Sequence, residues 1–384
     1  MVTMRVGIIG GGVGGLSAAL ALQRVGVAAT VYEQAPALEA TGAGIGLWPG
    51  ALSALRRMGV ADWFWDLPVC PFRWARTATA DGRTLIGFDV REITGGLGYV
   101  VRRSDLQQAL LDPLSREHVR TGKRLDGLTQ DAAGVELAFG DGSTERAEVV
   151  IGADGLRSTV REVLLGVTAP RCSGQTAYRG LAPFAVANPG MMQETQSAGW
   201  RGAVHPLDST NVYWWVARPA PPGVDETADQ RKRVVLRGVA EWSGGLPQAV
   251  AATPAAAILK NDLYDRDPVT SWSAGRVTLL GDAANPTTPN LGLGGCMAIE
   301  DALVLARAFA ENAAHGPALA QYEFERHART ASVVRMSRLM GRTGALTNRA
   351  AVTAWRMVNA VTPPRVAAAM LSREVGYGPG PLRR

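Results

Sequence analysis

The stretch Met4–Glu33 reads MRVGIIGGGVGGLSAALALQRVGVAATVYE and decides the fold. Its residues 5–9 form a short β-branched run, GGGVGG follows without a gap at 10–15, and helical spacing of apolar residues resumes over 16–24. The order of strand, tight glycine turn and helix is the context in which G-x-G-x-x-G is a strong signal. It predicts a parallel α/β domain that holds the pyrophosphate of a dinucleotide.

The glycines of this motif have separate roles. Gly10 permits the sharp turn, Gly12 lets backbone N–H groups approach a pyrophosphate, and Gly15 lets the helix start pack against the strand. A second strand, residues 28–32, ends in Glu33, at the spacing where a carboxylate accepts hydrogen bonds from ribose hydroxyls. The alternative is a glycine turn without a ligand. It would not explain why the strand, the glycines, the helix and the acidic residue all occur at the expected spacing.

Composition is that of an ordinary globular protein of 384 residues with 47% hydrophobic content, enough for a large core in two domains. The formal net charge is +6, and the basic residues are scattered along the chain and mostly arginine, so we expect no nucleic-acid partner. Three dispersed cysteines predict neither a disulfide framework nor a metal site. No stretch resembles a signal peptide or a membrane span, which predicts a cytoplasmic protein without a membrane partner.

The nucleotide domain is expected to be discontinuous. Residues 71–89 read as a β-hairpin with its turn at Asp81-Gly82, and residues 103–111 as a helix with Ser104 as N-cap. A long β-rich region follows, and a buried strand at 275–280 resumes the α/β pattern. The predicted segments are 1–70, 96–165 and 271–345 for the nucleotide domain, 71–95 and 166–270 for a β-sheet substrate domain, and 346–384 for a C-terminal helical part broken at Pro363-Pro364.

Three segments together carry a resemblance to a known family: GGGVGG at 10–15, IGADGLRSTVRE at 151–162, and GRVTLLGDAANPTTPNLGLGGCMAIEDA at 275–302. The chain resembles the single-component FAD-dependent aromatic hydroxylases of the p-hydroxybenzoate hydroxylase type. Closest in layout are the short members that act on salicylate, urate, nicotinate-type rings or tetracyclines. The resemblance spans nearly the whole chain and is loose between residues 166 and 270.

The resemblance implies a fold and a reaction. The fold is α/β, a Rossmann-type FAD-binding domain of the GR2 type with an inserted β-sheet substrate domain and C-terminal helices. FAD is bound non-covalently, NADPH or NADH is a transient reductant, and O2 is the co-substrate. An aromatic or heteroaromatic small molecule is hydroxylated or epoxidised through a C4a-hydroperoxyflavin. The enzyme is expected as a monomer or a homodimer.

The resemblance also implies cofactor-binding positions. Asp154 is expected at the flavin and the arriving nicotinamide, although it could instead cap the helix that follows. Asp282 is expected on the ribityl chain and Arg103 on the polar part of the flavin, although Arg103 could be a surface residue. The full expected set is Gly10, Gly12, Gly14, Gly15, Glu33, Gln34, Gly44, Ile45, Gly46, Arg103, Leu125, Asp154, Asp282, Pro289, Gly292, Leu293, Gly294 and Gly295.

Four residues of the second sheet are expected on the substrate wall: Arg179, Arg201, His205 and Tyr213. Arg201 and Tyr213 match positions where the short urate-hydroxylase-like members face the ring. His205 could deprotonate a phenol, because its reference pKa of about 6.5 suits a general base. The alternative is that all four are ordinary sheet residues.

Two positions depart from the family pattern, which usually has His where this chain has Asn285 and Gln where it has Leu293. These departures leave open an inactive flavin-binding partner protein. Among enzymes, the alternatives are a flavin dehydrogenase and a halogenase. A halogenase needs a lysine near the flavin. We expect the three lysines, Lys123, Lys232 and Lys260, to be poorly placed for that.

Overall fold

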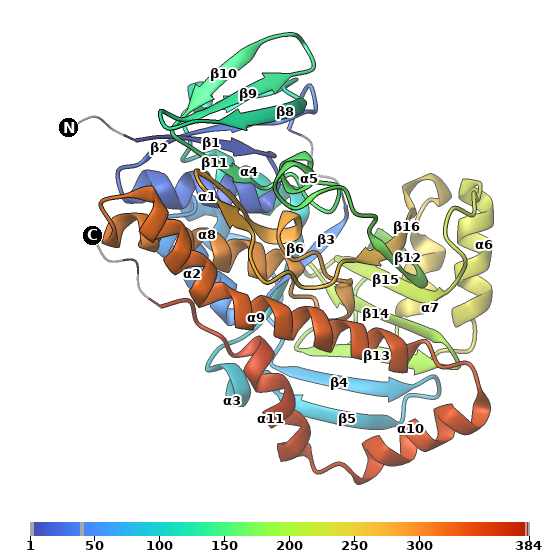
Figure 1. Ribbon diagram of the computed structural model, residues 1–384. Coiled ribbons are helices and arrows are strands. Elements are labelled where there is room, and N and C mark those ends of the chain that lie inside the picture. Colours follow the sequence, from blue (N-terminus) through green and yellow to red (C-terminus); the bar gives the residue numbers. More distant parts are fainter. Residues whose placement is uncertain (1–3, 39–41, 381, 383–384) are drawn as a thin grey trace.

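The computed structural model describes residues 4–38, 42–380 and 382, so the ends of the first and last expected segments lie outside it. Two sheets lie at opposite ends of the molecule, with α8 (Gly294–Glu311) beside the first and the long α9 (His315–Gly344) running across the middle (Figure 1). The fold is mixed α/β, as the sequence predicts.

The first sheet has six strands in the order β17-β18-β11-β1-β2-β7, and β1 is parallel to both of its neighbours. Its strands are β1 (Arg5–Ile9), β2 (Ala28–Tyr32), β7 (Val119–Arg120), β11 (Val149–Gly152), β17 (Ser273–Ala274) and β18 (Val277–Leu279). The predicted return of the chain to this sheet after residue 270 is confirmed, because β18 pairs with β11. A separate three-stranded sheet contains β8 (Leu125–Gln130), β9 (Val135–Phe139) and β10 (Thr144–Ala147).

Small residues bring α1 (Val13–Arg24) close to its neighbours. A Cβ on Gly14 would lie 2.9 Å from a methyl carbon of Leu280 and 3.3 Å from the Cβ of Ala298 on α8. Glycine at this position therefore sets how closely α1 approaches α8 and the end of β18.

The second sheet has seven strands in the order β16-β12-β15-β14-β13-β4-β5. They are β4 (Trp74–Thr79), β5 (Thr84–Asp89), β12 (Arg171–Pro183), β13 (Met191–Ser197), β14 (Trp200–Pro206), β15 (Asn211–Pro219) and β16 (Leu259–Asp265). The predicted hairpin is confirmed as β4 and β5, and it joins the sheet beside β13. The exact domain limits stay a proposal.

Helices cover one face and one edge of this sheet. Against one face, α6 (Ala228–Val239) and α7 (Leu246–Ala252) bury an apolar layer around Trp214 and Tyr178. Beside the edge strand β5 lie α10 (Arg349–Val361) and α11 (Pro364–Val375), separated at the predicted double proline. The opposite face of the sheet is left to form one wall of the cavity described below.

The expected cap at Ser104 is wrong. Helix α4 (Arg103–Leu111) has Arg102 as its N-cap and no side-chain capping hydrogen bond, and the Ser104 hydroxyl donates to Asp105. Strand β6 (Tyr99–Arg102) runs directly into α4, so no separate capping residue stands between them.

Candidate active site

One large cavity, of about 1230 Å³, extends from the glycine turn after β1 to the open face of the second sheet. All the expected cofactor-binding residues line it except Gly15 and Leu293, and of the expected substrate wall Arg179, His205 and Tyr213 line it. Residues far apart in the sequence are thus brought to one continuous space.

The glycine turn leaves the N-terminus of α1 open to this cavity. Gly12 is the N-cap, no side chain caps the helix, and a Cβ added to Gly12 would meet no atom within 4 Å. Gly10 has φ +108°, and a Cβ on Gly15 would lie 1.9 Å from the Gly10 carbonyl oxygen. Gly15 therefore serves close packing, while Gly12 keeps uncapped N–H groups accessible to an anion.

Glu33 is fixed where the second strand ends. Its two carboxylate oxygens accept hydrogen bonds from the backbone N–H groups of Gly11 (2.7 Å) and Ala35 (2.8 Å). A carboxylate has about four acceptor sites, so two remain for ribose hydroxyls. Gln34 and Leu125 line the same end of the cavity.

Asp282 presents a carboxylate that no hydrogen-bond donor in the described residues satisfies. It follows β18, its side chain is exposed to the cavity, and protein surrounds it on the other sides. Burial raises the pKa of Asp282 to about 6, with Arg103 partly offsetting the effect. The adjoining Gly281 N–H donates to Asp301 (3.1 Å), which fixes the turn that carries Asp282.

Asp301 is itself held by a buried ion-pair cluster. Arg326 of α9 is 0% exposed and contacts Asp301 at 2.5 Å and Glu300 at 2.9 Å. The position of Asp282 therefore depends on packing between α8 and α9.

The loop before α8 supplies a second open helix N-terminus. Leu293 is the N-cap without a side-chain capping bond, and Gly292 has φ +64°. Facing it is β3 (Gly44–Leu47), and a Cβ on Gly295 would lie 2.5 Å from the Ile45 side chain. Backbone from both segments thus approaches the cavity closely, as a flat ring system requires.

These features fit FAD. Two uncapped helix N-termini suit anionic groups, the Gly12 cradle has room for a pyrophosphate, and Glu33 and Asp282 would present acceptors to the ribose and ribityl hydroxyls. The residues that would hold the two ends of FAD, Glu33 and Asp282, lie more than 200 positions apart in the sequence.

Asp154 combines the two roles considered from the sequence. It lines the cavity and also accepts hydrogen bonds from the Ser158 hydroxyl (2.5 Å) and the Val160 N–H (3.2 Å) at the start of α5 (Thr159–Leu165). Arg161 does not reach the cavity: its guanidinium is buried and donates to the carbonyls of Ala283 and Ala284. It braces the loop after Asp282 instead.

The wall on the second sheet consists of two neighbouring cross-strand rows. Strand register places Glu194, Ala203, Trp215 and Arg179 in one row, and pairs His205 with Tyr213 in the next. Arg179 and Glu194 stand three strands apart, about 14 Å at 4.7–4.9 Å per strand. The wall therefore has the Arg179 guanidinium at one end, the Glu194 carboxylate at the other, and the aromatic surface of Trp215 between them.

His205 is neutral in this environment. Burial lowers its pKa to about 4, with Glu194 partly offsetting the effect. The Trp215 indole N–H donates to His205 Nε2 at 3.2 Å, and an indole N–H can only donate, so the imidazole proton resides on Nδ1. The lone pair on Nε2 already accepts the hydrogen bond from Trp215, which weakens the general-base role expected for His205.

Arg201 is not on the cavity surface, contrary to expectation. It is 1% exposed and forms a two-point ion pair with Glu194, at 2.8 Å for both Nε–Oε1 and Nη2–Oε2. Its Nη1 donates to Asn290 Oδ1 (2.8 Å) and to the Met340 carbonyl. The residue shares the cavity side of the sheet, but α9 and the loop at Asn290 cover it.

Glu194 is the wall residue that the sequence analysis missed. Burial alone raises its pKa, but the Arg201 guanidinium outweighs this and the pKa is lowered, so the carboxylate is ionised. Gln196 donates to Oε1 at 2.7 Å. No motif surrounds Glu194; only the pairing of β13 with β14 reveals that it lies beside His205 and Arg201.

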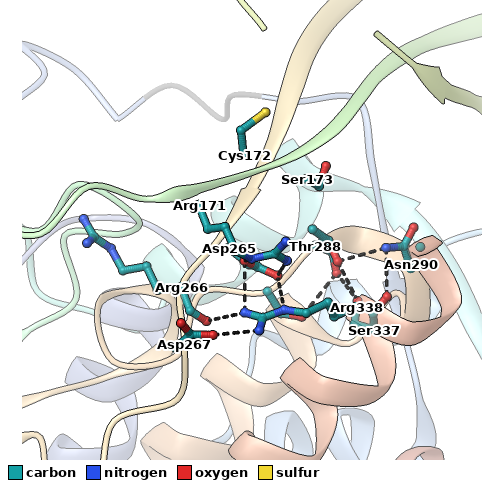
Figure 2. Close-up of polar contacts among 12 residues, drawn as sticks. Arg171, Cys172, Ser173, Asp265, Arg266, Asp267, Thr288, Asn290, Ser337 and Arg338 are labelled. Atoms are coloured by element: carbon teal, nitrogen blue, oxygen red, sulfur yellow. Dashed lines mark hydrogen bonds and ion pairs between the residues drawn. The ribbon is translucent and has the colours of Figure 1, made fainter. Parts of the chain in front are cut away.

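Polar contacts tie α9 to the second sheet and to the loop before α8 (Figure 2). Arg338 contacts Asp265 at the end of β16 (3.0 Å) and Asp267 (2.7 Å), and Arg171 of β12 also pairs with Asp265. Nearby, Asn290 donates to the Thr288 hydroxyl and the Ser337 carbonyl. Asn290 lies in the loop before α8, which we call the flavin-side loop, and it connects this loop to α9 and to Arg201.

The two departures from the family pattern affect the cavity little. Asn285 is 3% exposed, does not line the cavity, and both polar atoms of its amide lack partners in the described residues. Leu293 is 1% exposed and turned inward, so only its backbone could meet a cofactor. Neither of these two side chains is part of the cavity wall.

The chain is similar to known proteins over most of its length. The family described as FAD binding domain matches residues 3–337. Aurachin C monooxygenase/isomerase of Stigmatella aurantiaca is 34% identical over 348 residues, covering 88% of each chain, and the FAD-dependent urate hydroxylase of Klebsiella pneumoniae is 33% identical over 87% of this chain and 89% of its own. The crystal structure of Klebsiella pneumoniae HpxO complexed with FAD and uric acid superposes with a TM-score of 0.89, at 29% identity, over 97% of this chain and 96% of that one.

Proposed function

The chain belongs to the FAD binding domain family, and on that premise we propose that it is an FAD-dependent monooxygenase that hydroxylates an aromatic or heteroaromatic small molecule, with NAD(P)H as reductant and O2 as co-substrate. The observation that carries the proposal is the single cavity, which joins the Gly12 cradle and Asp282 to the wall formed by His205, Tyr213 and Glu194.

FAD, when bound, supplies the redox chemistry: NAD(P)H and O2 are consumed, one oxygen atom enters the ring and the other leaves as water. The protein's own contribution is binding and orientation. Uncapped N-termini of α1 and α8 face the cofactor, and Tyr213 packs against β3, since a Cβ on Gly44 would lie 2.5 Å from its ring. Aromatic side chains on the wall exclude water from the reacting face.

We assign Glu194 to substrate orientation. The described contacts use two acceptor sites of Oε1 and one of Oε2, which leaves one site on Oε2 for a donor in the cavity. Because the Arg201 guanidinium is paired with Glu194, this end of the wall offers a carboxylate acceptor and not a free guanidinium. The preferred substrate is a flat ring with an N–H or O–H directed at Glu194.

The reaction is tested by NAD(P)H consumption with a panel of hydroxylated rings that includes uric acid. A substrate should stimulate consumption and gain one ¹⁸O atom from ¹⁸O2. A flavin dehydrogenase would give no ¹⁸O incorporation, and an inactive flavin-binding protein would show no ligand-dependent turnover. Either result across the whole panel would contradict the proposal.

The role of Glu194 is tested separately by binding to the FAD-loaded protein, followed through the flavin absorbance. A phenolic ligand should bind more tightly than its O-methyl ether, and this preference should shrink about tenfold in Glu194→Gln, since a hydrogen bond to a charged group contributes about 1.5–3 kcal/mol. The double variant Glu194→Gln with Arg201→Met removes the unpaired arginine as a confounding cause. An unchanged preference in both variants would refute the role.

A halogenase remains the less favoured alternative. Lys123 and Lys260 both line the cavity. Each ammonium is paired with a carboxylate, Lys123 with Asp141 and Lys260 with Glu226.

In the described part of the chain no helix is long and apolar enough to cross a bilayer. A cytoplasmic location, and a monomeric or dimeric state, are further parts of this proposal, testable by cell fractionation and light scattering.

A further inference from the structure

The net charge of the protein is concentrated in its last segment. Residues 342–384 contain seven arginines and a single acidic residue, Glu374, which gives a formal charge of +6. The whole chain also carries +6, so residues 1–341 are neutral in sum. The one acidic residue does not face solvent, because Glu374 is 2% exposed and paired with Arg329 of α9.

The same segment exposes an apolar surface. On α10, Met357, Val358 and Val361 are 65%, 54% and 79% exposed, and on α11, Val366 and Met370 are 49% and 58% exposed. Positions 354, 357, 358 and 361 follow helical i, i+3, i+4, i+7 spacing, and Ala354 is exposed as well. We call these six residues the C-terminal apolar stripe.

The stripe is separate from the proposed active site. Helices α10 and α11 lie beside the edge strand β5, at the end of the molecule remote from the first sheet (Figure 1). No residue after Ala298 lines the cavity in the described part of the chain. The family match ends at residue 337, before both helices begin.

We propose that α10 and α11 dock the enzyme on the surface of an anionic lipid bilayer. Basic residues combined with an exposed apolar helix face are the features of segments that lie in a membrane interface, where arginines meet anionic headgroups and apolar side chains enter the acyl boundary. The expectation of no membrane partner rested on the lack of a spanning segment, and surface docking needs none.

Charge argues against a second copy of the chain as the occupant. An isologous contact through the stripe would bring two segments of +6 together, and like charges at an interface oppose association. A nucleic acid would satisfy the arginines but would leave the valines and methionines without apolar contact. An anionic bilayer complements both properties at once.

The test is flotation of the FAD-loaded protein with vesicles of phosphatidylcholine alone or with 30% phosphatidylglycerol. The protein should float with the anionic vesicles and be released by added salt. Val361→Asp should reduce flotation at least tenfold. The matched control is Val167→Asp, at an equally exposed valine (82%) outside the C-terminal helices, which should float as the wild type does.

A second pair of variants tests the charges. Arg349→Gln with Arg373→Gln should weaken binding to anionic vesicles about fivefold per arginine, whereas Arg57→Gln with Arg116→Gln, at exposed arginines elsewhere, should not. Retention of FAD shows that each variant is folded. Absence of flotation in the wild type, equal losses in the controls, or a dimer that Val361→Asp converts to a monomer without a change in flotation would each overturn the proposal.

Discussion

Arg201 lies behind the substrate wall and forms a two-point ion pair with the wall residue Glu194, with both N–O distances at 2.8 Å and Arg201 1% exposed. Arg201 also reaches Asn290 on the flavin-side loop, at 2.8 Å. The pair thus links the wall of the second sheet to the loop that leads into α8.

Removal of one partner should be far more costly than removal of both. Arg201→Met leaves the Glu194 carboxylate without its cation, and breaking a buried pair in this way costs about 3–5 kcal/mol. The double variant with Glu194→Gln should recover most of that loss, because no buried charge is left over. Urea unfolding of wild type, both single variants and the double variant gives the coupling energy; additive losses would show that the pair does not act as a unit.

His205 should make stability depend on pH. Its folded pKa of about 4 lies below the unfolded value of about 6.5, so the unfolded chain binds more protons between these limits and stability is lost as the pH falls from 6.5 towards 4. His205→Asn lacks this loss. The free energy of unfolding of the variant relative to wild type should therefore rise by roughly 2–3 kcal/mol between pH 7.5 and pH 4.5, and a constant difference would show that His205 titrates normally.

The fold could be predicted further than the site. Glycine, strand and helix signals at residues 4–33 are local, and so is the hairpin at 71–89; these predictions are confirmed. The family resemblance predicted Arg201 on the wall, and the strand alternation does place it on the cavity side, but cover by Met340 and Asn290 is a tertiary property. Glu194 lies in no recognisable motif. Its position on the wall depends on the pairing of β13 with β14, which cannot be predicted from the residue and its sequence neighbours alone.

The Gly12 cradle predicts a specific loss of cofactor. Gly12→Val should abolish FAD retention, since the side chain would enter the open space at the α1 N-terminus. The matched control is Gly127→Val on β8, where an added Cβ also meets no atom within 4 Å but the position lies outside the cavity lining. The ratio of flavin to protein absorbance after purification measures both, and a yellow Gly12→Val protein would remove the basis for the pyrophosphate assignment.

Asp282 predicts that the affinity for FAD rises with pH. Burial raises its pKa to about 6, and ribityl hydroxyls that donate to the carboxylate would stabilise its ionised form and lower that pKa in the complex. Binding then releases a proton below about pH 6, so affinity is full above that pH and falls about tenfold by pH 5. Titration of the apoprotein with FAD at several pH values, followed by flavin fluorescence, measures this slope. Asp282→Asn keeps the size of the side chain but cannot ionise, and its affinity should be nearly independent of pH over the same range. Equal slopes for both proteins would place the titrating group elsewhere and leave Asp282 without contact to the ribityl chain.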